Sequence, residues 1–283
     1  MSTPLLRATN LVKEFPVLGT GGLLRRPDTF RAVDDVSFEI NAGDTLALVG
    51  ESGSGKSTTA RLAARLLDVT SGTVELDGED VTGLGRADLR RFRSEVQVVF
   101  QDPYSSLNPR HTVERIVTAP LLYQQRSIPG GARAFTRSLM ERVGLDPDHS
   151  QKYPAQFSGG QAQRIGIARA LAVGPRVVVC DEAVSALDVS VQAQVINLLR
   201  ELQREEGLTY LFIAHDLAVV RQIATRVAVM TQGRIVEEGD RDAVFDAPQH
   251  EYTRKLLDAV PRIRPEWERE RRRNAALAAG ASA

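Results

Sequence analysis

The sequence predicts an α/β fold with a mixed sheet at its core, an N-terminal antiparallel β-subdomain and an inserted helical subdomain. Three observations support this fold class. Short apolar runs of strand length alternate with helical stretches after residue 45, as in sheets covered by helices. Residues before this point are β-rich and partly alternate between apolar and polar. Residues 103–173 carry helical periodicity with little strand character.

The N-terminal region is expected to contain two strands, Leu5–Phe15 and Arg31–Ile40. Between them, Pro16–Phe30 is rich in Gly and Arg and is expected to be an exposed hairpin insertion. The core strands are expected at Thr45–Val49, Val96–Phe100, Val177–Cys180 and Tyr210–Ala214.

Helices are expected on both sides of the inserted segment and within it. The apolar periodicity indicates helices at Ser57–Leu67, Val113–Tyr123, Ala132–Val143, Gln161–Ala172 and Val191–Glu205. A hairpin joined at Gln232-Gly233 and two short helices follow the last core strand. We expect residues 1–262 to form one domain, with its helical subdomain at about 103–173, and residues 263–283 to form a charged tail.

Composition narrows the function classes. The 283 residues carry 36 Lys+Arg and 36 Asp+Glu, so general electrostatic binding to nucleic acid or anionic membranes is disfavoured. The single cysteine, Cys180, excludes an internal disulfide or a multi-cysteine metal site. No apolar run approaches the roughly 18–20 residues of a membrane span, and no signal peptide is visible. We therefore expect a soluble, cytoplasmic protein.

A glycine-rich loop between the strand Thr45–Val49 and the next helix matches G-x-x-x-x-G-K-[ST], the P-loop. Its glycines allow consecutive N–H groups to face a phosphate chain, and the helix directs its positive end at the same anion. Lys56 is expected to reach the β- and γ-phosphates and Ser57 to ligate Mg²⁺. The candidate ATP-binding residues of the loop are Gly50, Glu51, Ser52, Gly53, Ser54, Gly55, Lys56, Ser57 and Thr58.

Two carboxylates follow the apolar strand that begins at Val177. The carboxyl end of a parallel strand is where α/β proteins place their ligands. Asp181 is expected to hold Mg²⁺, and Glu182 to orient and polarise the attacking water. On its own this pattern is equally compatible with two solvated acids at the end of a strand. The presence of a P-loop in the same sequence favours a Mg²⁺ site.

The segment Ser158-Gly159-Gly160-Gln161 precedes a helix and lies between the P-loop and the acidic strand end. Ser158 is suited to cap that helix, and the glycines free the backbone to approach an anion. This order of motifs resembles the ATPase subunits of ABC transporters, with the segment as their signature loop. Gln101 after its strand resembles the Q-loop, and Asp188 lies in a D-loop-like Ser185–Asp188. His215 resembles the switch histidine.

The resemblance extends over roughly residues 3–262 and is strongest for the branch that imports oligopeptides, dipeptides and nickel. Features of that branch are the insertion Pro16–Phe30, the run Phe100–Pro109, the run Val184–Val191 and His250-Glu251-Tyr252-Thr253. It implies ATP hydrolysis by Glu182, His215, Gln101 and Lys56, with ATP and Mg²⁺ bound and the metal held by Ser57, Gln101 and Asp181. It also implies that Phe15 stacks on adenine, although a core phenylalanine at a strand end is the alternative.

The family works as a head-to-tail ATPase dimer, in which Ser158–Gln161 serves the partner's nucleotide. The resemblance therefore implies a second ATPase subunit, identical or related, and two membrane permease subunits. An extracytoplasmic solute-binding protein would take part indirectly, and nucleic acid would not. The chain would sit peripherally at the cytoplasmic face of the cell membrane. A non-transport ABC ATPase acting on DNA or ribosomes is the alternative, disfavoured by the absence of a coiled-coil, zinc or tandem module.

Overall fold

The computed structural model describes residues 3–17 and 28–259. Its first sheet is antiparallel, with strand order β2-β1-β4-β5. The strands of this sheet are β1 (Leu6–Pro16), β2 (Thr29–Ile40), β4 (Ser71–Leu76) and β5 (Glu79–Asp80). The β1–β2 ladder continues through Pro16 and Thr29 to a bond from the Val17 N–H to the Asp28 carbonyl. The predicted hairpin is thus present at its base, and its tip lies outside the described residues.

The second sheet is mixed, with strand order β10-β9-β3-β8-β7-β6. Neighbouring strands from β9 to β6 are parallel, whereas β10 pairs antiparallel with β9. Its strands are β3 (Thr45–Val49), β6 (Val96–Val99), β7 (Val177–Asp181), β8 (Thr209–Ile213), β9 (Arg226–Thr231) and β10 (Arg234–Asp240). The predicted α/β fold class is confirmed.

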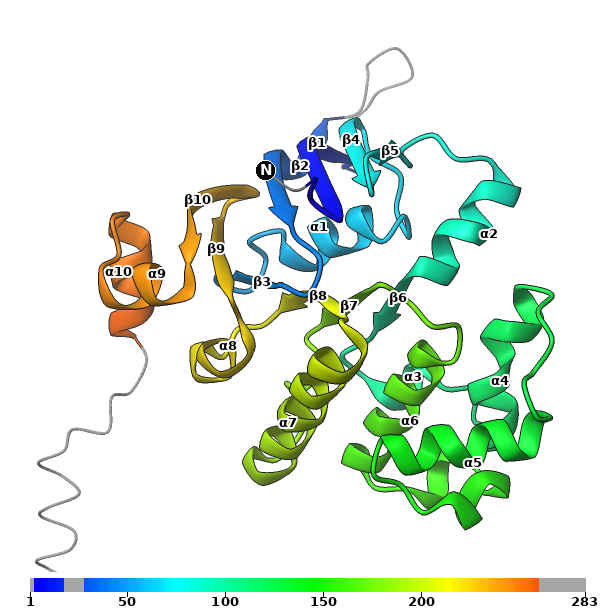
Figure 1. Cartoon of the computed structure of the whole chain (residues 1–283). Coiled ribbons are helices and arrows are strands. Elements are labelled where there is room, and N and C mark those ends of the chain that lie inside the picture. The colour runs from blue at the N-terminus through cyan, green and yellow to red at the C-terminus, as the bar shows by residue number, and fades with distance from the viewer. Residues whose placement is uncertain (1–2, 18–27, 260–283) are drawn as a thin grey trace, which may run out of the picture.

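The helices lie beside the mixed sheet and beyond its two edges (Figure 1). They are α1 (Lys56–Ala63), α2 (Arg86–Glu95), α3 (Pro103–Ser106), α4 (Val113–Tyr123), α5 (Ala132–Arg142), α6 (Gly159–Leu171), α7 (Val189–Glu206), α8 (Leu217–Ile223), α9 (Arg241–Asp246) and α10 (Glu251–Asp258), with short 3-10 turns at Pro147–Gln151 and Pro154–Gln156. No helix among residues 3–17 and 28–259 combines the length and apolar character needed to cross a bilayer.

The mixed sheet is covered on both faces: its central strands β3, β7 and β8 are buried at every position and are apolar except at their ends. On one face, Leu46 and Leu48 pack with α1 and the antiparallel sheet, so that α1 lies between the two sheets (Figure 1). On the other face, Ala47 and Val49 join a core cluster with apolar side chains of α6, α7 and α8. Alternate residues of a strand point to opposite faces, which is why one strand serves both cores.

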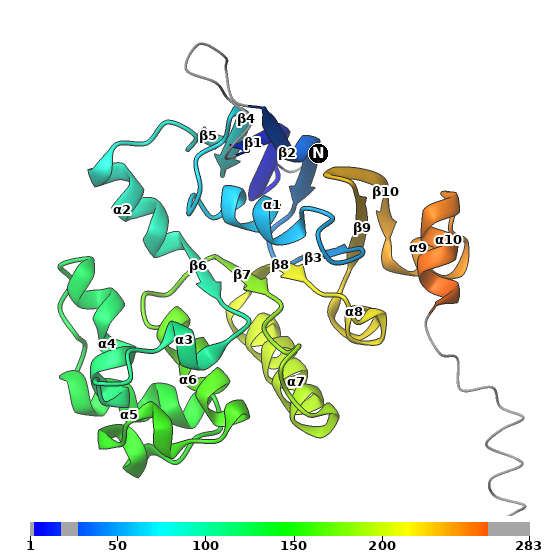
Figure 2. The same cartoon turned by 180° about the vertical axis from the view of Figure 1, so that it is seen from behind.

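Helices α3 to α6 lie together beyond the β6 edge of the mixed sheet in both views (Figure 2). The side chain of Arg169 on α6 donates to the Ser106 carbonyl at the end of α3, 2.5 Å away, and so joins two helices of this group. Burial lowers the pKa of this guanidinium. The boundaries 103–173 proposed for an inserted subdomain stay a prediction.

Most predicted elements are confirmed within a few residues, and the largest difference in a helix boundary has a structural cause. The helix expected at Ser57–Leu67 ends at Ala63, because Arg65 takes a positive φ of 52° and donates to the Val81 carbonyl. The sequence analysis did not predict β4, β5, α2, α3 or α8. The expected tail, residues 263–283, lies outside the described residues.

Candidate functional site

The predicted site residues follow strands that end at one edge of the mixed sheet. Leu48 of β3 is in register with Ile213 of β8, and Ile213 is in register with Asp181 of β7. On the far side of β7, Val99 of β6 pairs with Cys180. The residues that follow these strands therefore emerge side by side, as the carboxyl ends of parallel strands do. They are the P-loop from Gly50, His215, Glu182 and Gln101.

The P-loop begins at a position that only glycine can occupy. Gly50 has a φ of +148°, and a Cβ there would lie 2.1 Å from the Met230 carbonyl oxygen. The chain can thus turn sharply out of β3 directly against β9. Gly55 ends the loop as the N-cap of α1, and Ser57 and Thr58 form the first turn of that helix with Lys56. The positive end of α1 is therefore directed at the loop.

Lys56 is buried, and its ammonium donates only to oxygens of its own loop. Nζ lies 2.8 Å from the Gly50 carbonyl, 2.7 Å from the Glu51 carbonyl and 3.2 Å from the Ser54 hydroxyl. In the described part of the chain it forms no ion pair, and burial lowers its pKa against the opposing effect of Glu182 and Asp181. A buried ammonium bonded only to neutral oxygens favours an incoming anion. The loop therefore has both the geometry and the charge to take a phosphate.

The tip of the P-loop is joined to the neighbouring hairpin by backbone bonds. The Ser54 N–H donates to the Glu51 carbonyl, and the Ser54 carbonyl accepts from the Gly233 N–H at 3.0 Å. The Gly233 carbonyl in turn accepts from the Asp34 N–H of β2 at 2.8 Å. The turn between β9 and β10 thus connects the loop to the antiparallel sheet. Ser52 and Gly53 are exposed at the tip.

The two carboxylates of the acidic strand end have different surroundings. Asp181 is 5% exposed, and one of its oxygens lies 3.5 Å from the Arg61 guanidinium of α1. Glu182 takes a positive φ of 52°, and its N–H donates to the Ile213 carbonyl. This conformation brings a Glu182 oxygen to 3.6 Å from Nδ1 of His215. Glu182 and His215 therefore form an acid–imidazole pair at the sheet edge.

Gln101 is exposed and lines a pocket together with Arg61 and Asp181. The oxygens available near the phosphate loop come from a hydroxyl, an amide and a carboxylate, on Ser57, Gln101 and Asp181. Hard oxygen donors of this kind suit Mg²⁺, which usually keeps substrate phosphates and waters as its other ligands. Within residues 3–17 and 28–259 no cluster of three or more His, Cys, Asp or Glu side chains could hold a metal by itself. The residues fit a metal that enters with a phosphate chain.

The segment Ser158–Gln161 forms a capping box at the start of α6. The Ser158 hydroxyl accepts from the Gln161 N–H at 3.4 Å, and the Gln161 side chain accepts from the Ser158 N–H at 3.0 Å. Both side chains are exposed, as is Asp188, the N-cap residue of α7. In the described chain the side-chain bonds of this segment are internal, and none reaches the P-loop. The segment therefore presents an unpartnered helix N-terminus to solvent.

Gly160 sets the distance between α6 and α7. A Cβ at Gly160 would lie 2.2 Å from Cγ1 of Val191, whereas a Cβ at Gly159 would meet nothing closer than 3.7 Å. We expect Gly160→Ala to destabilise the fold by about 1–3 kcal/mol, because a β-branched neighbour on a helix cannot yield easily. Thermal unfolding measures this effect.

Two variants control this prediction. Gly159→Ala should leave the unfolding temperature nearly unchanged, and Val191→Ala should restore stability in the Gly160→Ala background. Equal stability of the two glycine variants would show that the α6–α7 spacing does not depend on Gly160.

Phe15 lies one residue before the end of β1, opposite Phe30, with 36% of its surface exposed. Lys13 places its ammonium 5.3 Å from the Phe15 ring centroid. The ring is thus half-exposed at a strand end, as an adenine-stacking residue requires, and its stacking role stays a prediction.

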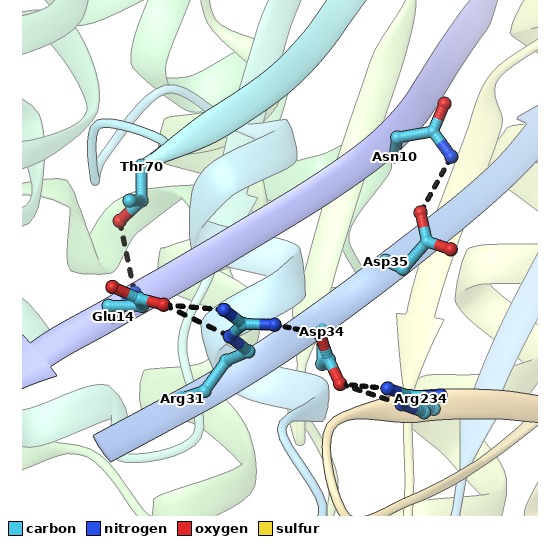
Figure 3. Close-up of polar contacts among 7 residues, drawn as sticks. All are labelled: Asn10, Glu14, Arg31, Asp34, Asp35, Thr70 and Arg234. Carbon is cyan, nitrogen blue, oxygen red and sulfur yellow. Dashed lines mark hydrogen bonds and ion pairs between the residues drawn. The ribbon is translucent and has the colours of Figure 1, made fainter. Parts of the chain in front are cut away.

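A polar network beside Phe15 ties the two sheets together (Figure 3). Arg31 of β2 bonds Glu14 at 2.8 Å and Asp34 at 2.8 Å, and Arg234 of β10 donates to the other Asp34 oxygen at 2.7 Å. Hydrogen bonds from Arg31 and Arg234 lower the pKa of Asp34. The strand that ends near Phe15 is therefore held in place relative to the hairpin that contacts the P-loop.

Three residues of the site were not assigned to it from the sequence. Arg61 pairs with Asp181, the Tyr104 hydroxyl donates to the Phe157 carbonyl at 2.8 Å, and the Tyr252 hydroxyl accepts from the Glu51 N–H at 3.1 Å. Arg61 lies five residues after Lys56, about 140° further around the helix, so its spacing does not predict its contact with Asp181. The other two contacts join segments too far apart in sequence to be recognised.

The fold and the site together define a P-loop nucleotide-binding protein with a second, outward-facing glycine segment. Comparison with known proteins identifies its family. The sequence pattern of the ABC transporter family matches residues 33–185, and that of the oligopeptide/dipeptide transporter C-terminal region matches residues 236–281. The chain belongs to the ABC transporter ATPase family.

Two curated relatives illustrate the branch. The glutathione import ATP-binding protein GsiA of Pectobacterium atrosepticum is 52% identical over 91% of this chain. The probable peptide ABC transporter ATP-binding protein y4tS of Sinorhizobium fredii is 51% identical over 92%. The chain spans 41% of the length of GsiA and 74% of y4tS.

Solved structures share the fold. A dimeric post-hydrolysis state of the ATP-binding cassette MJ0796, bound to ADP and Pi, superposes with a TM-score of 0.73 at 28% identity, over 83% of this chain and 98% of that one. CbiO1 of Clostridium perfringens, part of the transporter complex cbiONQ, superposes with a TM-score of 0.71 at 25% identity. The match covers 92% of this chain and 97% of CbiO1.

Proposed function

We propose that this chain is the ATP-hydrolysing subunit that energises an ABC importer for peptides or a related small solute. It works as a head-to-tail ATPase dimer docked on two membrane permease subunits, at the cytoplasmic face of the membrane. The observation that carries the proposal is the division of the site. Phosphate-binding and acidic residues follow strands that end at one sheet edge, while the exposed side chains of Ser158 and Gln161 bond only within their own capping box in the described part of the chain. A second copy or a related subunit would complete the pocket.

The proposed chemistry is in-line attack of water on the γ-phosphate of ATP. Lys56 is expected to turn from its own loop carbonyls to the β- and γ-phosphates, and its charge stabilises the transition state. Glu182 accepts the proton of the attacking water, and His215 holds Glu182 in place while contacting the γ-phosphate. Ser57, Gln101 and Asp181 would hold Mg²⁺, which neutralises charge on the phosphate chain when it is bound.

Docking to the permease is proposed for the outer surface of the helical group. Three large side chains of this group, Tyr104, Leu122 and Tyr123, expose 45%, 59% and 56% of their surfaces and could contact a permease subunit. The Tyr104 hydroxyl bonds the carbonyl of Phe157, the residue directly before Ser158. Movement of a docked permease would thereby reach the signature segment through one hydrogen bond.

Co-purification from membranes tests the proposal. We expect the tagged chain, expressed with its neighbouring genes, to be isolated with permease subunits and to hydrolyse ATP faster when that importer's solute-binding protein delivers a peptide. Isolation with ribosomes or nucleic acid, with no membrane protein, would overturn the proposal in favour of a non-transport ATPase.

A further inference from the structure

One backbone N–H of the P-loop is bonded to a side chain 201 residues further along the chain. The Glu51 N–H donates to the Tyr252 hydroxyl over 3.1 Å. Tyr252 is the second residue of α10, and its ring packs against the large core cluster of the mixed sheet. The ring is thus anchored by apolar contacts while its hydroxyl contacts the phosphate loop.

The first turn of α10 is itself fixed to the sheet. The Glu237 carboxylate of β10 accepts from the Gln249 N–H at 2.7 Å and from the His250 N–H at 3.0 Å. Burial acts to raise the pKa of Glu237, but the hydrogen bonds that its carboxylate accepts together outweigh burial and lower the pKa. His250 then caps the helix by accepting from the Tyr252 N–H at 3.1 Å. The position of the Tyr252 hydroxyl is therefore determined by a strand of the core.

The carbonyl group of Glu51 is bonded to Lys56. The Glu51 carbonyl accepts from Lys56 Nζ at 2.7 Å and from the Ser54 N–H at 3.2 Å. A phosphate chain would compete for the Lys56 ammonium and weaken this contact, because an anion is a stronger acceptor than a carbonyl. The bond to Tyr252 is donated by the N–H of Glu51, not by its carbonyl, and so it stays in place. Among the described residues, Tyr252 is then the one side chain outside the loop that is bonded to the Glu51 backbone.

We infer that Tyr252 is a positioning residue of the nucleotide site, which holds the start of the P-loop in its binding-competent shape. The inference rests on the proposed function, since it assigns the loop to nucleotide phosphates. Apparent affinity falls in proportion to the fraction of empty loops in the competent shape. A hydrogen bond with a net worth of about 0.5–1.5 kcal/mol corresponds to a roughly 2- to 12-fold effect on affinity.

The test is Tyr252→Phe, which removes the hydroxyl and keeps the ring. We expect its dissociation constant for a fluorescent ADP analogue to rise about fivefold, with only a small change in the unfolding temperature. Hydrogen exchange of the Glu51 amide should also become faster without nucleotide, because its acceptor is gone. Glu237→Gln should shift affinity in the same direction by a smaller factor.

Tyr210→Phe is the matched control. The Tyr210 hydroxyl donates to the Leu199 carbonyl at 2.9 Å inside the core, away from the P-loop. This control should lower the unfolding temperature and leave ADP affinity unchanged. Unaltered affinity and unaltered Glu51 exchange in Tyr252→Phe would overturn the inference, as would an equal loss of affinity in Tyr210→Phe. A wild-type chain that binds no ADP would instead refute the proposed function, and Glu51 exchange would still decide the role of Tyr252.

Discussion

Replacing Glu182 with glutamine is expected to abolish ATP turnover while leaving ATP binding intact. Glutamine has nearly the same size but cannot accept the proton of the attacking water. Loss of a general base lowers the rate by about 10²–10⁴-fold. Because the backbone bond from the Glu182 N–H to Ile213 does not involve the side chain, the fold should not change. Phosphate release measures turnover.

The same variant should accumulate as an ATP-bound dimer, because closure no longer ends in hydrolysis. Size-exclusion chromatography with and without ATP detects this species. Glu201→Gln, on the exposed side of α7, is a matched control that should behave as the wild-type chain. Hydrolysis at an undiminished rate in Glu182→Gln would refute the role assigned to this carboxylate.

Replacing Ser158 with arginine is expected to stop turnover by a different route. Within residues 3–17 and 28–259 the Ser158 side chain has its hydrogen bond inside its own capping box and none to the P-loop, so nucleotide binding to the lone chain should keep its affinity. In a dimer the large side chain would fill the space meant for the partner's γ-phosphate. We expect turnover to fall at least about tenfold, as for the loss of one strong transition-state contact.

Ser158→Ala separates this steric effect from the loss of the helix cap. Alanine should cost about 1 kcal/mol of stability, as the loss of an N-cap does, with a smaller loss of activity. Nucleotide titration of the monomer and turnover at high protein concentration are the two measurements. Lost nucleotide binding in monomeric Ser158→Arg would show that the segment acts within its own chain.

The parts of this protein that could be predicted from sequence are those where a local pattern determines the structure. The P-loop needs glycine at position 50 for a φ of +148°, and Ser158 with Gln161 forms a capping box three residues apart. The strands Thr45–Val49 and Tyr210–Ala214 are recognisable because they are short runs made almost entirely of apolar and aromatic residues. Because these strands alternate with helices, they are expected to be parallel and to end at one edge of the sheet, where the site lies.

The elements that were missed lack such a pattern. Only Ala87, Leu89 and Phe92 of α2 are apolar and only Phe92 is buried, so the helix lacks the apolar content that marks the core helices. The strand β4 alternates only weakly and β5 is two residues long. The contact between Tyr252 and Glu51 depends on how α10 packs on the sheet, which no local pattern encodes. The helix end at Ala63 likewise depends on a tertiary contact of Arg65.

The central claim is that each nucleotide pocket is shared between two subunits, one giving the P-loop and the other the segment at Ser158. The dependence of specific ATPase activity on protein concentration tests this claim most directly. Specific activity should fall toward zero on dilution and recover when the chain is concentrated or supplied with its partner ATPase subunit. A specific activity that stays constant from micromolar to nanomolar protein, with the chain monomeric by light scattering, would contradict the claim.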